Sequence, residues 1–191
     1  MKQELKIELV RKGIHVLIAL VPALAALNRN GTLVLLAAGT AIYISFETFR
    51  LHGIQVPVIS AVTDFASRRR DRGRFVWGPV TLGAGAFFSL LLFPPLPAAL
   101  AVYALAAGDS VSSLAGKFFG RLRPAFLCGK SVEGSLACFT AVFFCSWVAS
   151  GETRTALIAA AAATVTEALP LRNWDNIAIP LITGMAVLFF V

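Results

Sequence analysis

"GIHVLIALVPALAAL", residues 13–27, is the stretch that decides the fold class of this chain. Its one ionisable side chain is His15, and its length approaches what a helix needs to cross about 30 Å of hydrocarbon. Comparable apolar runs recur at 32–49, 79–93, 95–107, 133–149, 154–169 and 177–191. We therefore expect an all-α integral membrane protein with about seven transmembrane helices.

The composition agrees with this fold class. The chain has 191 residues, is 58% hydrophobic and only 14% charged, and its mean hydropathy is +0.79. These values are too apolar for an ordinary soluble domain, so we expect residues 1–191 to form a single membrane-embedded domain. The run 13–27 is followed by NRNG, which is not a small-residue cleavage site, so we expect a retained span and not a cleaved signal peptide.

Lysine and arginine residues are divided unequally between the two ends of the expected spans. Fifteen of the seventeen lie in the N-terminal segment or in the connections after the second, fourth and sixth spans, and the exceptions are Arg29 and Arg154. The positive-inside rule then predicts a cytoplasmic N-terminus and an external C-terminus in the inner (cytoplasmic) membrane. This topology, together with anionic lipid head groups, accounts for the net charge of +7 without a nucleic-acid partner.

Residues 54–70, between the second and third spans, are too polar at one end to cross a membrane. Their apolar side chains recur at helical spacing, as at Val58, Val62 and Phe65, and arginines follow at 68–70. This pattern predicts an amphipathic helix that lies on the cytoplasmic interface.

The stretch GDSVSSLAGKFFGRLRPAFLCGKSVEG, residues 108–134, places charged residues beside an apolar run. Asp109, Ser113 and Lys117 are spaced i, i+4 and i+8, so in a helix they share one small and polar face. A carboxylate there offers the hard oxygen that Mg²⁺ prefers, and Lys117 and Lys130 offer positive charge for phosphates. The alternative interpretation is a solvated loop with ion pairs, one of them between Asp109 and Lys117.

Other polar residues stand at the ends of the expected spans. Arg11 and His15 are four apart where the first span enters the membrane, and Glu167 lies near the cytoplasmic end of the sixth. Asp175 and Asn176 open the seventh. Ionisable groups at membrane depth are candidates for function, so we expect carboxylates from different spans to converge on the cytoplasmic side.

Four short motifs occur in one order along the chain: RKGIH at 11–15, GDSVSSLAGKFFGR at 108–121, GKSVEGS at 129–135 and TEALPLRNWDNIAIPL at 166–181. Together they resemble the family of dolichol kinases, phytol kinases and CTP-dependent diacylglycerol kinases. The resemblance runs from Arg11 to Pro180, and so covers nearly the whole chain. It implies a membrane enzyme that transfers phosphate from a nucleoside triphosphate, usually CTP, to a lipid alcohol.

The family's functional residues can be carried over motif by motif. Its Gly-Asp motif falls on Gly108, Asp109, Gly116, Lys117 and Gly120; its Lys-x-x-Glu-Gly element falls on Lys130, Glu133 and Gly134; its late acidic residue and Asp-Asn pair fall on Glu167, Asp175 and Asn176. With the residue analysis, this predicts the catalytic residues Asp109, Lys130, Glu133, Glu167 and Asp175. The predicted nucleotide- or phosphate-binding residues are Arg11, His15, Gly108, Ser113, Gly116, Lys117, Gly120, Gly134 and Asn176. Mg²⁺, or another divalent cation, is expected at Asp109 and Glu133.

Two other classes of function remain open. Phosphatidate cytidylyltransferases share the Gly-Asp and Lys-x-x-Glu-Gly elements, but their closing signature contains histidine, and this chain has none after His52. A non-catalytic transporter or scaffold would line a path through the membrane with charge, whereas the charges here gather on one side, apart from Arg29, Glu152 and Arg154. The expected partners are therefore CTP or another nucleoside triphosphate, a lipid alcohol and the bilayer. The acceptor, the choice of Asp175 or Glu167 as base, and a homodimeric state stay open.

Overall fold

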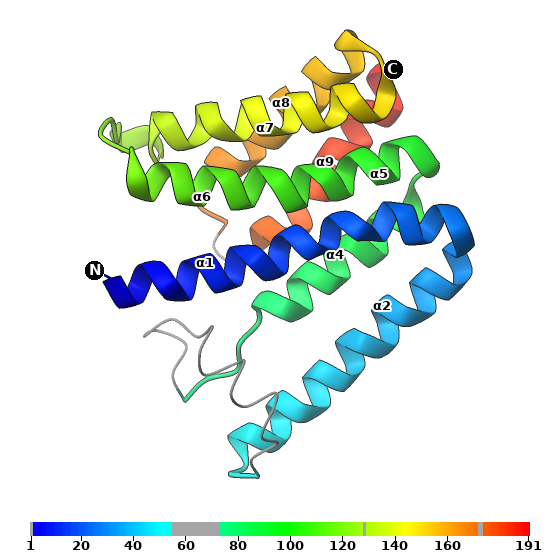
Figure 1. Cartoon of the computed structure of the whole chain (residues 1–191), viewed down its shortest axis with the longest axis vertical. Coiled ribbons are helices and arrows are strands. Elements are labelled where there is room, and N and C mark those ends of the chain that lie inside the picture. The colour runs from blue at the N-terminus through cyan, green and yellow to red at the C-terminus, as the bar shows by residue number, and fades with distance from the viewer. Residues whose placement is uncertain (1, 55–72, 128, 172–173) are drawn as a thin grey trace.

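The computed structural model describes residues 2–54, 73–127, 129–171 and 174–191 (Figure 1). Within these ranges every regular element is a helix and there is no strand, so the predicted all-α class is confirmed. The amphipathic helix expected at 54–70 lies, apart from residue 54, outside the described residues.

The first two apolar runs form one continuous helical segment with a sharp bend. This segment comprises α1 (Lys2–Leu17), the 3₁₀ turn η1 (Ile18–Leu20) and α2 (Val21–Leu51). Asn28 has the non-helical angles φ −156° and ψ 96°, and its side-chain Oδ1 accepts the N–H of Gly31 at 2.9 Å. The chain reverses direction in this region, so the runs 13–27 and 32–49 lie on two legs, as the sequence predicts (Figure 1).

The side chain of Arg29 attaches this bend to the end of α4 (Gly78–Leu92). Its Nε and Nη2 atoms donate to the carbonyl oxygen of Leu90 at 3.0 and 2.5 Å, and Nη2 also reaches the carbonyl of Phe93 at 3.4 Å. The carbonyls in the last turn of a helix lack partners within the helix, so this arginine stabilises the end of α4.

The remaining helices follow in the expected order. They are α5 (Pro95–Tyr103), the π-helical turn η3 (Ala104–Gly108), α6 (Asp109–Phe118), the 3₁₀ turn η4 (Ala125–Leu127), α7 (Val132–Ser150), α8 (Thr153–Ala168) and α9 (Asp175–Phe190). The first three continue into one another as a helix of 24 residues, Pro95–Phe118. Residues 108–118 are therefore the end of a long helix and not part of a connection, which extends the fourth predicted run beyond residue 107.

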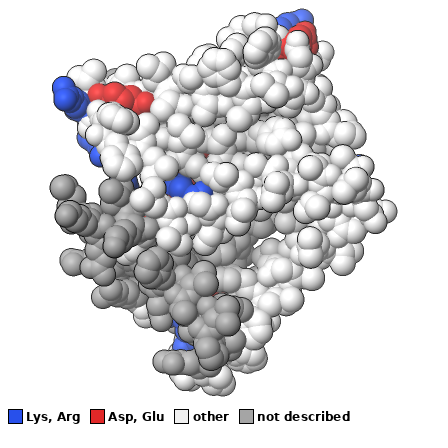
Figure 2. Space-filling model, in the orientation of Figure 1, with Lys and Arg blue, Asp and Glu red and all other residues white. Residues whose placement is uncertain are grey.

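Among the described residues, three helical segments are long and apolar enough to cross a membrane: Ile7–Leu51, Pro95–Phe118 and Val132–Ser150. Two shorter apolar helices, α4 and α9, accompany them. Large apolar side chains face outward, such as Leu27, Val148 and Phe189, which are 85%, 80% and 72% exposed. Figure 2 shows a broad uncharged surface on the right of the molecule, which suits contact with lipid better than contact with water.

Small residues allow the helices to pack closely around the interior. Ala104, Ala159, Ala160 and Ala163 are fully buried in one cluster, where small side chains let the helices approach closely. At the contact of α4 with α9, a Cβ atom on Gly85 would collide with the carbonyl oxygen of Asn176. This close approach brings the start of α9 next to α4.

Candidate functional site

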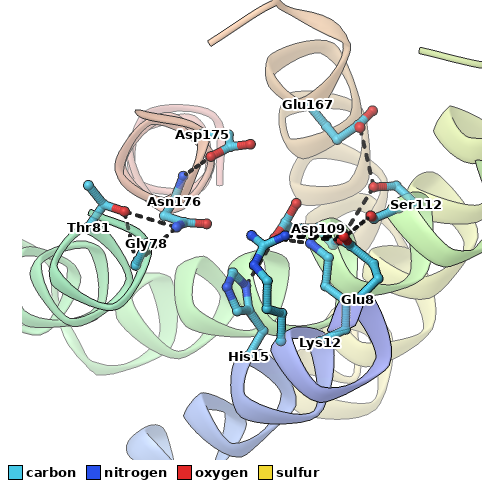
Figure 3. A network of polar contacts seen from close by, with 12 residues as sticks. Glu8, Lys12, His15, Gly78, Thr81, Asp109, Ser112, Glu167, Asp175 and Asn176 are labelled. Carbon is cyan, nitrogen blue, oxygen red and sulfur yellow. Dashed lines mark hydrogen bonds and ion pairs between the residues drawn. The ribbon is translucent and has the colours of Figure 1, made fainter. Parts of the chain in front are cut away.

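A cavity of about 290 Å³ lies where the charged ends of α1, α6, α8 and α9 meet. It is lined by Arg11, Lys12, Gly78, Asp109, Ser112, Ser113, Gly116, Lys117, Arg123, Gly129, Lys130, Ser131, Gly134, Glu167, Asp175 and Asn176. Ten of the fourteen predicted site residues are among them, although they are separated by up to 165 positions in the chain. Figure 3 shows several of these side chains converging from different helices.

Asp109 is held by two residues of α1. Nζ of Lys12 lies 2.5 Å from Oδ2 of Asp109, and Nδ1 of His15 lies 3.0 Å from the same oxygen (Figure 3). All three residues are buried. A buried carboxylate needs such partners, because burial of an unpaired charge is costly. His15 contacts Asp109 but does not itself line the cavity.

A second cluster of polar side chains, centred on Glu8, joins α1 to α6 one helical turn before Lys12. Glu8, at 1% exposure, accepts from Oγ of Ser113 at 2.9 Å and from Nζ of Lys117 at 2.7 Å. Arg11 also reaches Glu8, with Nη1 3.2 Å from Oε2. Lys117 thus pairs with Glu8 and not with Asp109, so the ion pair of the alternative loop interpretation is wrong.

Glu167 of α8 binds groups from α7 and α6. Its Oε1 lies 3.1 Å from Nζ of Lys130 and accepts from Oγ of Ser112 at 3.2 Å. Oγ of Ser135 donates to Oε2 at 3.5 Å. This carboxylate therefore fixes Lys130 at the cavity wall.

The first residues of α9 complete the wall. Nδ2 of Asn176 donates to Oγ1 of Thr81 at 2.9 Å and to the carbonyl of Gly78 at 3.3 Å, which holds the start of α9 against α4 (Figure 3). The N–H of Asn176 donates to Oδ1 of Asp175 at 3.0 Å. The carboxylate of Asp175 is thereby presented to the cavity.

Glu133 does not join the cavity. Its Oε1 accepts the N–H groups of Arg121 and Leu122 at 2.9 and 3.1 Å, so the side chain holds the loop that follows α6. The structure therefore does not bring Glu133 together with Asp109 as a pair of metal ligands. Across the ranges that the structure describes, no group of three or more His, Cys, Asp and Glu side chains is placed to hold a metal ion.

The predicted glycines serve mainly the contact between α6 and α7. A Cβ on Gly134 would lie 2.9 Å from the carbonyl oxygen of Ser112, and one on Gly108 would lie 3.0 Å from Val142. Gly116 and Gly120 pack in the same way on Ser131, whose Oγ accepts the N–H of Gly134 and caps α7. Of these four glycines, Gly116 and Gly134 line the cavity, whereas Gly108 and Gly120 do not.

Several functional positions were missed by sequence reasoning. Lys12 and Arg123 were counted only as topological charges, and Glu8 was not considered. The spacing of Glu8, Lys12 and His15, i, i+4 and i+7, places them on one helical face and is the signal that identifies the first cluster. Arg123 reaches the cavity because its guanidinium donates to the carbonyls of Gly129 and Gly116 at 2.5 and 2.8 Å.

The charges of the cavity favour an anion. Five cationic side chains line it against three carboxylates, and Glu8 behind the wall pairs with two of the five cations, so the excess is one positive charge. Cations on separate segments of one cavity wall suit a multiply charged anion such as a polyphosphate. No protein-family model, no curated protein and no solved structure matches the chain.

Proposed function

We propose that the chain is a lipid kinase that transfers the γ-phosphate of CTP, or of another nucleoside triphosphate, to the hydroxyl of a membrane lipid alcohol. The acceptor class is a polyprenol such as dolichol, phytol or diacylglycerol. The observation that carries the proposal is the cavity itself, in which cations and carboxylates from α1, α6, α8 and α9 meet at one end of an apolar helical protein.

Binding of the triphosphate is assigned to the cationic side chains. Lys117 and Lys130 reach the cavity from opposite ends of the loop between α6 and α7, and Arg11 and Arg123 lie beside them. Phosphoryl transfer depends mainly on positioning and on stabilisation of negative charge, so a set of fixed cations is a suitable apparatus.

The donor set also fits a divalent cation. Mg²⁺ typically takes one or two carboxylates together with substrate phosphates, and Asp109 and Asp175 line the same cavity. Of these two, Asp109 would hold the ion together with the substrate phosphates, without Glu133, and Asp175 stays available as a base. When bound, Mg²⁺ would offset part of the negative charge of the phosphates.

In the transfer, the lipid hydroxyl oxygen attacks the γ-phosphorus, the bond from that phosphorus to the bridging oxygen breaks, and the nucleoside diphosphate leaves. The hydroxyl proton passes to a carboxylate. Asp175 suits this task better than Glu167, because Glu167 is already bound by Lys130, Ser112 and Ser135.

The proposal includes the topology of seven spans with a cytoplasmic N-terminus. Support comes from Figure 1, in which the N-terminus and the C-terminus lie at opposite ends of the bundle, as an odd number of crossings requires. The cavity then faces the cytoplasm at the membrane boundary. A site at that depth meets the nucleotide from the aqueous side and the alcohol from the bilayer.

Transfer of label tests the function. Protein purified in detergent is incubated with γ-labelled CTP or ATP and a panel of polyprenol, phytol and diacylglycerol, and the extracted lipid is counted. We expect one alcohol to take the label with the wild type, and not with Lys130→Met. Arg154→Met, which removes an exposed cation at the far end, should keep full activity.

A second arm separates the alternative reaction. Phosphatidate with α-labelled CTP would acquire the label only if the protein were a cytidylyltransferase. That result, or the absence of label from every alcohol with both nucleotides, would refute the kinase.

A further inference from the structure

Glu8 is a buried acid whose described partners all belong to the cavity wall. Its carboxylate accepts from Ser113 and Lys117 of α6 and contacts Arg11 on its own helix. These three residues line the cavity, whereas Glu8 does not and is only 1% exposed. A side chain in this place touches no substrate, but it determines how two cations enter the cavity.

We propose that Glu8 is a positioning residue that holds Lys117 and Arg11 in the orientation in which they bind the polyphosphate chain of the nucleotide. This assignment rests on the proposed function, because it names a further residue of that same site. Lys117 has a flexible side chain that is 44% exposed, so without an anchor it would sample many rotamers. An ammonium group has three donors, so one can bind Glu8 while others face the ligand.

Two effects of removing the carboxylate have opposite signs. Loss of one negative charge beside the cavity strengthens the general attraction for an anion. Loss of the anchor weakens binding, because Lys117 must then be ordered at the moment when the ligand arrives. Glu8→Gln removes the charge and changes the shape very little, so the direction of the change in affinity distinguishes the two effects.

The experiment measures binding of inorganic tripolyphosphate to the full chain in detergent by calorimetry. We expect Glu8→Gln to raise the Kd about tenfold, the equivalent of one charge-assisted hydrogen bond, despite the added positive charge. In the kinase assay the same variant should raise KM for the nucleotide by a similar factor and change kcat less than twofold. Glu8→Asp, which keeps the charge on a shorter side chain, should bind with intermediate affinity.

A double-mutant cycle tests the route through Lys117. Lys117→Gln weakens binding by itself, and in its background Glu8→Gln should have a smaller effect than in the wild type, because the contact with Lys117 is already lost and the contact with Arg11 remains. Additive effects of the two substitutions would overturn the proposal.

The chain offers a matched control in Glu47. This glutamate is fully buried and pairs with an arginine three residues later, with Arg50 Nη2 at 2.7 Å, as Glu8 pairs with Arg11. It also accepts the N–H of Val76 and does not line the cavity. Glu47→Gln should lower the melting temperature and leave the Kd for tripolyphosphate unchanged. A merely structural role of Glu8 would give the same pattern at that position.

The outcomes separate this proposal from the kinase proposal. If Glu8→Gln folds and binds tripolyphosphate as tightly as the wild type or more tightly, the positioning role is refuted while kinase activity can still be observed. If that variant does not fold, wild-type affinity in Glu8→Asp refutes it. If the wild type labels no lipid but binds tripolyphosphate with a coupled cycle, the kinase fails and the role of Glu8 stands. Absence of tripolyphosphate binding by the wild type would refute the role.

Discussion

Replacing Lys12 with methionine removes the cation that faces the buried carboxylate of Asp109. Nζ of Lys12 lies 2.5 Å from Oδ2 of Asp109, and the two side chains are only 4% and 11% exposed. Removal of one partner from a buried ion pair costs about 3–5 kcal/mol, because the other charge stays buried. His15 remains 3.0 Å from the carboxylate, so we expect a loss near the lower limit, about 3 kcal/mol.

A loss of about 3 kcal/mol corresponds to a fall of roughly 6–12 °C in melting temperature for a chain of this size. The assay heats the protein in detergent and measures the fraction that remains monodisperse by size-exclusion chromatography. The double variant Lys12→Met with Asp109→Leu should recover most of the loss, since an apolar pair can replace a buried ion pair at little cost. Arg154→Met, which removes an exposed cation, serves as the control.

The reasoning is refuted if Lys12→Met melts within about 2 °C of the wild type. It is also refuted if the double variant is less stable than Lys12→Met. Either result would mean that α1 is not docked on α6 through this pair.

Three further predictions concern other parts of the site and its supports. Glu133→Gln keeps an acceptor for the loop N–H groups and, since Glu133 does not line the cavity, removes no ligand of the metal ion. The Mg²⁺ concentration for half-maximal activity should therefore stay within about twofold of wild type. A larger shift would restore Glu133 as a metal ligand. Gly85→Ala should lower the stability by about 1–3 kcal/mol, because the added Cβ collides with α9, and this loss should lower the melting temperature in detergent. At Gly13 a Cβ meets nothing within 4 Å, so Gly13→Ala should leave the melting temperature unchanged. Equal melting temperatures of the two variants would contradict the packing of α4 on α9. Asp175→Asn should lower kcat about 10²–10⁴-fold with little change in nucleotide KM, and a larger kcat effect from Glu167→Gln would identify that residue as the base instead.

Much of the fold could be predicted because apolar runs and helix breakers are local signals. The runs predicted at 79–93, 133–149 and 154–169 match α4, α7 and α8 to within one residue at each end. The extension of the fourth run to Phe118 was not predicted, because Asp109 and Lys117 make the sequence polar while their charges are paired inside the protein. The polar side chains therefore led to a predicted span that ends at residue 107, although a helix was expected at Asp109–Lys117.

The residues of the candidate site were predicted better than the contacts among them. Asp109, Lys130 and Asp175 meet at one cavity, as expected from their places at the ends of predicted spans. Their partners depend on which helices touch, and a single sequence does not contain that information in local form. Lys12 was counted only as a charge that sets the membrane topology, because a lysine near the end of a span already has that explanation. Glu133 was assigned to the metal site because its actual partners are backbone N–H groups of the loop, which the sequence does not reveal.

The arginine at the bend of the first helical segment affects how the charge asymmetry of this chain is counted. Arg29 is one of the two basic residues on the sparsely charged side, yet its guanidinium is directed at the carbonyls of Leu90 and Phe93. Its positive charge is matched there by the negative pole of the dipole of α4. On the proposed topology, the external face therefore carries two exposed cations, Arg29 and Arg154, and the first is accounted for by its task at the end of α4.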